Sequence, residues 1–95
     1  MKEYIPAPID TTDIVLPDTL QELQELLAKN AHEVWAKQRM NEGWSYGTTR
    51  NDELKQTPNM VPYEALTELE KNYDRSMSAE TLRLIMKLGF TISKS

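Results

Sequence analysis

The sequence contains no cysteine, one histidine and only three glycines. Without cysteine the chain can form neither a disulfide nor a thiolate metal site, and a single histidine excludes a histidine-rich metal site. The separated glycines Gly43, Gly47 and Gly89 cannot build the glycine-rich loops that bind phosphate in Walker or dinucleotide motifs. We therefore expect no metal and no cofactor.

Long apolar runs and an excess of positive charge are also missing. No apolar segment approaches the roughly 20 residues of a membrane-spanning helix, and the N-terminal residues lack the apolar stretch of a signal peptide. The net charge of −4 argues against a general binder of nucleic-acid backbones, which needs a basic face. We expect a cytoplasmic protein that binds neither membrane nor nucleic acid.

The sequence shows no recognisable combination of catalytic residues. His32-Glu33 resembles the start of a zinc-protease helix motif, but Ala36 stands where the second histidine belongs. No combination of nucleophile, histidine and acid is evident, so we expect no enzymatic activity. The ordinary role for His32 is a hydrogen bond to a helix-end carbonyl or a carboxylate.

The 95 residues, 39% of them hydrophobic, predict a single globular domain over 1–95. Residues 1–17 read as an extended arm, because Pro6, Pro8 and Pro17 restrict their own φ and hold the preceding residues extended. We expect this arm to be ordered and to lie against the core through its apolar side chains. These are Ile5, Ile9, Ile14, Val15 and Leu16.

A helical segment is predicted over residues 18–42, where apolar residues recur every three or four positions. Asn30 is a position at which the segment can kink or break, and Gly43 ends it. The apolar positions, here called the leucine face, are Leu20, Leu23, Leu27, Ala31 and Val34. On a continuous helix Trp35 lies about 80° from the centre of the leucine face, beside Ala28 and Arg39.

The remaining residues predict a loop with a short strand (43–62), helices (63–88) and a second short strand (90–93). Thr67 and Glu70 have capping-box spacing, and Ser78 is a candidate start for a further helix. The short strand at 44–46 is expected to pair with 90–93. The predicted fold class is α+β and mainly α-helical, with three to four helices and a two-stranded antiparallel β element.

A group of aromatic and basic residues in the middle of the chain is the candidate binding site. An indole at the border of a helix face, beside a guanidinium, favours stacking on a flat ligand, and arginine binds phosphate bidentately. The alternative is that both tryptophans are core residues and the basic residues are solvated. The group comprises Trp35, Arg39, Trp44, Tyr46, Arg50 and Lys55.

Several strings, in one order and over residues 4–92, together resemble the ryanodine receptor repeat, the RyR domain. They are Tyr4-x-Pro6-x-Pro8-Ile9-Asp10-Thr11, Val15-Leu16-Pro17, Leu27-Ala28-x-Asn30-x-His32-Glu33-Val34-Trp35-Ala36, Arg39, Gly43-Trp44-x-Tyr46-Gly47, Lys55-x-x-Pro58, Val61-Pro62-Tyr63, Glu70-Lys71-x-Tyr73-Asp74, and Glu80-Thr81-Leu82 ending in Leu88-Gly89. The resemblance implies a compact α+β domain, of a kind that occurs as tandem pairs in calcium-release channels and as stand-alone copies in bacteria and phages.

The resemblance also implies a site. Paired repeats look able to hold an adenine nucleotide in the cleft between them, with a tryptophan matching Trp35 facing the base. Arg50 then lies where a basic residue meets phosphate, and Asp74 where a polar group reads base or ribose. Because this chain holds one repeat, a symmetric homodimer with two Trp35 rings facing across the axis would restore the cleft.

We therefore expect a non-catalytic module that binds an adenine-nucleotide-like molecule. The expected ligand-binding residues are Trp35, Arg39, Trp44, Tyr46, Arg50 and Asp74. The alternative is a protein–protein interaction or dimerisation module, whose Trp35 surface docks a partner without a small molecule. Nucleotide hydrolysis or transfer is a third alternative, for which the sequence offers no nucleophile or metal ligand.

Overall fold

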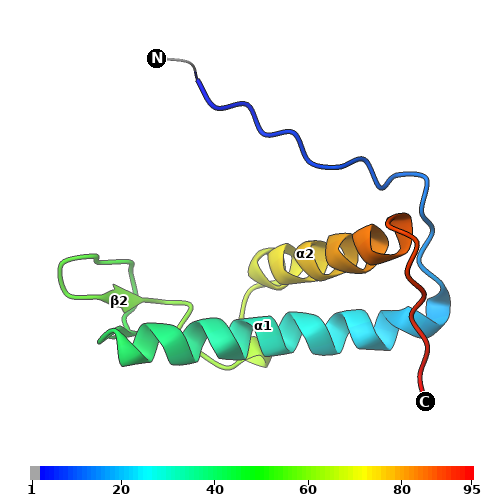
Figure 1. Ribbon diagram of the computed structural model, residues 1–95. Coiled ribbons are helices and arrows are strands. Elements are labelled where there is room, and N and C mark those ends of the chain that lie inside the picture. The colour runs from blue at the N-terminus through cyan, green and yellow to red at the C-terminus, as the bar shows by residue number, and fades with distance from the viewer. Residues whose placement is uncertain (1–2) are drawn as a thin grey trace.

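The computed structural model describes residues 3–95, so the first two residues of the predicted arm lie outside the described residues. Two long helices, α1 (Gln21–Asn41) and α2 (Glu68–Lys87), pack side by side and are joined by an irregular connection, residues 42–67 (Figure 1). The other elements are the 3₁₀ turns η1 (Asp18–Leu20) and η2 (Tyr63–Ala65) and the strands β1 (Ser45–Tyr46) and β2 (Gln56–Thr57).

The predicted helical segment 18–42 corresponds to η1 followed directly by α1. α1 continues through Asn30 without a break. It ends at Asn41, two residues before Gly43, whose φ of +94° lies in the left-handed region that glycine adopts without strain. The N–H of Gly43 donates to the carbonyl of Met40 at 3.0 Å. The local signals after Pro17 and at Gly43 thus locate both ends of α1.

α2 begins at the predicted cap. The hydroxyl of Thr67 accepts a hydrogen bond from the N–H of Glu70 at 3.2 Å, which satisfies one of the free N–H groups of the first turn. The helix then runs through Ser78 to Lys87. The expectation of three to four helices is therefore wrong: residues 3–95 contain two α-helices. Ser78 is buried in the middle of α2, where its small side chain serves packing and caps nothing.

The β element is also different from the prediction. β1 pairs with β2 in parallel, with Ser45 opposite Gln56 and Tyr46 opposite Thr57, and residues 90–93 form no strand. Figure 1 gives the reason, because the C-terminal segment crosses the N-terminal end of α1 while the strands lie at its other end. The 21 residues of α1 span about 30 Å, too far for the predicted pairing.

The face of α1 that packs inward is not the leucine face. The buried residues of α1 are Ala28 and His32, whereas Val34 is 48% exposed and Ala31 is exposed. These two faces are about 120° apart around the helix. Ala28, wholly buried, packs with Tyr63 and Leu66, and its short side chain allows the connection and α2 to approach α1 closely. The periodicity was correct for a helix but indicated the wrong buried side.

An ionic network reinforces the contact between the two helices. Glu25 of α1 accepts hydrogen bonds from Arg75 of α2 at 2.8 Å and from the hydroxyl of Tyr63 at 3.0 Å. The guanidinium of Arg75 keeps the pKa of the Glu25 carboxyl below its usual value. Arg75 also binds Glu68, about two turns nearer the start of α2. One carboxylate therefore ties α1, α2 and η2 together.

Residues 3–10 of the N-terminal arm do not lie against the core, contrary to the prediction, whereas Ile14 and Leu16 are half-buried. Tyr4 and Ile5 are 84% and 80% exposed, and Figure 1 shows the arm leaving the end of α2 and running apart from both helices. Only its base is held. The buried hydroxyl of Thr11 donates to both carboxylate oxygens of Glu80, at 2.8 and 3.0 Å, and Lys87 donates to Asp13 at 2.9 Å.

The orientation of α1 gives a matched test. Ala28→Leu inserts a larger side chain into a filled contact and should destabilise the protein by about 1–3 kcal/mol. Ala31→Leu, one turn along on the exposed flank, should change stability little. Urea unfolding followed by far-UV circular dichroism measures both at one protein concentration. If Ala31→Leu were the costlier change, the leucine face would be the buried one after all.

Candidate functional site

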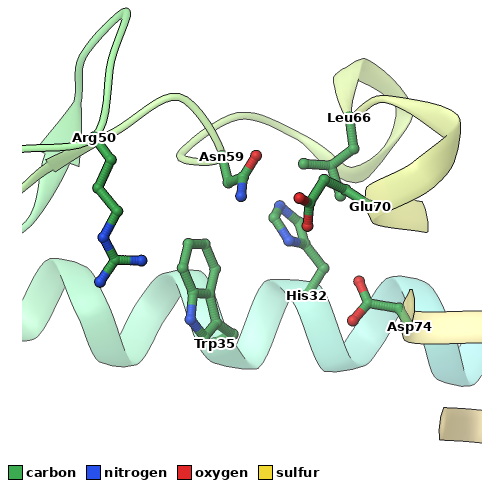
Figure 2. A pocket seen from close by; sticks show the side chains of 7 residues that line it. All are labelled: His32, Trp35, Arg50, Asn59, Leu66, Glu70 and Asp74. Atoms are coloured by element: carbon green, nitrogen blue, oxygen red, sulfur yellow. The ribbon is translucent and has the colours of Figure 1, made fainter. Parts of the chain in front are cut away.

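A cavity of about 310 Å³ lies between α1, α2 and the connection, at the lower end of the size range of small-molecule sites. Figure 2 shows seven side chains around it. α1, α2 and the connection all contribute to the lining, which comprises His32, Trp35, Arg50, Asn59, Leu66, Glu70 and Asp74.

His32 anchors the α1 side of the cavity. Its ring is almost fully buried, and Nε2 lies 2.7 Å from the carbonyl oxygen of Val61. Because a carbonyl only accepts, Nε2 carries the hydrogen of this bond. We expected His32 to bind a carbonyl at a helix end or a carboxylate. Its partner is a backbone carbonyl, but that carbonyl belongs to the connection. His32 therefore fixes the connection to α1.

Trp35 lies one turn after His32 on the same face of α1. The imidazole stacks on the indole, with ring centroids 5.5 Å apart and an angle of 25° between the planes. Trp35 is half-buried and lines the open cavity. The rings of His32 and Trp35 thus form one aromatic wall of the cavity (Figure 2).

Two carboxylates from α2, Glu70 and Asp74, lie at the His32 side of the cavity (Figure 2). Their spacing of four residues brings both to one face of α2. Burial raises the pKa of Asp74 above its ordinary value of 3.8, because desolvation disfavours the charged form, and the nearby His32 partly opposes this shift. This end of the cavity accepts hydrogen bonds.

A guanidinium, Arg50, reaches toward Trp35 from the opposite side (Figure 2). Its Nε donates to the loop carboxylate of Asp52 at 2.8 Å. Its Cζ also lies 5.4 Å from the ring centroid of Trp44, and Arg39 lies 5.6 Å from the same ring. Contacts of this kind are worth about 0.5–1 kcal/mol at exposed sites, so Trp44 helps hold Arg50 beside the cavity.

The sequence model of the RyR domain matches residues 4–94. The chain belongs to the RyR domain family. The resemblance stated from the quoted strings is therefore confirmed, and the cavity falls within the matched segment. Among residues 3–95 of this RyR domain, neither helix combines the length and apolar character needed to cross a lipid bilayer.

The cavity of this RyR domain brings together half of the predicted site residues. Trp35, Arg50 and Asp74 line it, although they are far apart in the sequence. Arg39 and Trp44 form the adjacent cation–π cluster, outside the lining. Tyr46 also lies outside the lining and is 54% exposed on β1. The other predicted basic residue, Lys55, donates to the carbonyl of Glu42 at 2.8 Å, beside the end of α1.

Four lining residues were not predicted as ligand contacts: His32, Asn59, Leu66 and Glu70. The four-residue spacing of Glu70 and Asp74 on a predicted helix would have indicated the pair of carboxylates. Nothing local marks Asn59, because its place depends on the path of the connection. Across the cavity, a cation and two carboxylates flank an aromatic wall, which suits a flat ring with hydrogen-bond donors at one end and negative charge at the other.

The raised pKa of Asp74 has a stability consequence. Because the folded-state pKa lies above the unfolded value, ionising Asp74 costs stability, and this cost is complete above the raised pKa and absent below the unfolded value. We expect Asp74→Asn to raise the melting temperature at pH 7 and to lose this advantage as the pH falls to about 4. The exposed Glu53→Gln serves as control. Equal effects of the two changes, or a gain that grows on acidification, would contradict this origin.

Proposed function

We propose that this RyR domain is a non-catalytic module that binds a small ligand of the adenine-nucleotide class in the cavity beside Trp35. The proposal rests on one observation: the cavity carries opposite charges at the two ends of the aromatic wall that the half-buried Trp35 forms with His32 (Figure 2). It places the protein in the cytoplasm and assigns it no membrane or nucleic-acid partner.

Each part of such a ligand has a matching group. The exposed face of Trp35 offers the base a stacking surface worth roughly 1–3 kcal/mol. The guanidinium of Arg50 suits a phosphate, which arginine binds through two parallel hydrogen bonds. Glu70 and Asp74 accept hydrogen bonds from an exocyclic amino group or from ribose hydroxyls. A purely apolar ligand would desolvate the carboxylates of Glu70 and Asp74 without offering them a hydrogen bond, which disfavours it.

The cavity is open and small, so a nucleotide would remain partly in solvent when bound to one chain. The homodimer expected from the resemblance would cover it with the Trp35 of a second copy. A dimerisation module without any ligand is the second candidate function. What favours it is the number of large apolar side chains left exposed on α1, α2 and the arm.

Nucleotide titration tests the proposed site. In a Trp44→Phe background Trp35 is the sole emitter, and its fluorescence should change on addition of ATP. Calorimetry on Trp35→Ala should then show an affinity about 5- to 150-fold weaker, the equivalent of the lost stacking.

Tyr46→Ala is the matched control, because Tyr46 is an aromatic of the expected site that lies outside the cavity. Its affinity should equal that of the wild type. If Trp35→Ala left the affinity unchanged, the site would be wrongly assigned. If no nucleotide bound, the dimerisation function would be favoured.

A further inference from the structure

The side of α2 that faces away from α1 is apolar and uncovered. Leu69, Tyr73 and Met77 follow one another at four-residue intervals and so share one side of the helix, here called the outer face. Each is exposed by between 63% and 71%. The buried residues Ala79 and Leu82 lie on the opposite side. α2 therefore has two apolar sides, of which the chain covers one.

The N-terminal arm is a second uncovered apolar surface. Tyr4, Ile5 and Ile9 are all exposed, and Pro6 and Pro8 keep the chain extended between them. An apolar segment that is already extended loses little backbone freedom on docking. This arm is thus suited to lie along a hydrophobic surface.

The arm is long enough to cover the outer face. Its residues 3–10 span about 25 Å in a polyproline-like conformation. The base of the arm is anchored at Glu80, and from there to Leu69 the helix rises about 17 Å. Length and position therefore match, yet the arm of the same chain does not lie there (Figure 1).

Hydrogen bonds at its base set the direction of the arm. Asp10 accepts from the N–H and the hydroxyl of Thr12 at 2.9 and 2.7 Å, and the N–H of Ile14 donates to Thr11 at 3.0 Å. With Thr11 and Asp13 bound to α2, these turns aim the arm away from its own helix. An arm held in this way reaches a neighbouring molecule more readily than it folds back.

The chain exposes more surface than a compact monomer of its mass, enough for a standard interface. The accessible surface of the chain is 7726 Å². A compact monomer of 11.0 kDa would expose about 5,600 Å². The excess of about 2,100 Å² is more than twice the roughly 800 Å² per partner that a standard interface buries.

We propose that two copies of this chain form a symmetric dimer by exchanging their arms, residues 3–10 of each lying on the outer face of α2 of the other. A two-fold axis makes the exchange reciprocal, so each molecule both gives and receives an arm. The contact covers both uncovered apolar surfaces at once. This contact differs from the dimer through Trp35 that the resemblance implies, because it leaves Trp35 uncovered, and it does not depend on nucleotide binding.

Light scattering on the purified full chain tests the dimer. We expect a mass twice the 11.0 kDa of the chain. Tyr73→Asp and Ile5→Asp, which charge the outer face and the arm respectively, should each reduce it to that of a monomer. Leu54→Asp, at an exposed leucine of the connection, should leave the dimer intact. A monomeric wild type, or a dimer that survives both charge changes, would overturn the proposal.

Cross-linking identifies whose arm occupies the face. Because the chain has no cysteine, Ile5→Cys in one batch and Tyr73→Cys in another introduce unique thiols. After mixing, a short bismaleimide should join the two variants into a covalent dimer, and Glu53→Cys in place of Tyr73→Cys should not. A chain that carries both Ile5→Cys and Tyr73→Cys tests the alternative, in which each N-terminal arm covers its own helix. A link formed within one chain, unaffected by dilution, would show that each arm covers its own helix and would overturn the exchange.

Discussion

The hydrogen bond between His32 and the carbonyl of Val61 determines where the connection crosses α1. A nearly buried imidazole without a partner would cost about 1–3 kcal/mol, so the connection is held to this point of the helix. Tyr63 and Leu66 follow within a few residues and close over Ala28. The same ring supports the indole of Trp35. Core and cavity thus share one anchor, and a change at His32 would disturb both.

The sequence predicted the helices better than it predicted how they pack. Capping by Thr67 and termination at Gly43 depend on neighbouring residues, and both signals are local enough to recognise. The buried side of α1 depends on what the connection and α2 bring to it, which periodicity does not contain. Leu23 and Leu27 were expected to face the core, whereas the buried residues of α1 are Ala28 and His32. Ala28 permits close approach to Tyr63 and Leu66, and His32 makes a hydrogen bond to Val61. The prediction of an antiparallel strand pair was wrong for the same reason. Alternation of apolar and polar residues can indicate a strand, but it does not indicate which other segment the strand pairs with.

The candidate site likewise contains residues that the sequence predicted and residues that it did not. Trp35 and Arg50 were identified as part of an aromatic and basic group, and Asp74 was identified from the family resemblance; all three line the cavity. Glu70 was missed although its four-residue spacing from Asp74 is a local signal, whereas the position of Asn59 depends on the path of the connection, which no short string encodes. Trp44 was expected to form a wall of the site. It instead lies between two arginines and supports Arg50 from outside.

The ion pair between Arg50 and Asp52 has a consequence for any anion that enters the cavity. Both partners are largely solvent-exposed, so their attraction is weak and readily reversed. An incoming anion would compete with Asp52, which accepts a hydrogen bond from Nε of the guanidinium, so part of the attraction it gains would be offset. The electrostatic attraction between Arg50 and an anion would then contribute little to the choice among different anions. Discrimination among negatively charged molecules would depend on the shape and hydrogen-bonding edge of whatever rests on the indole.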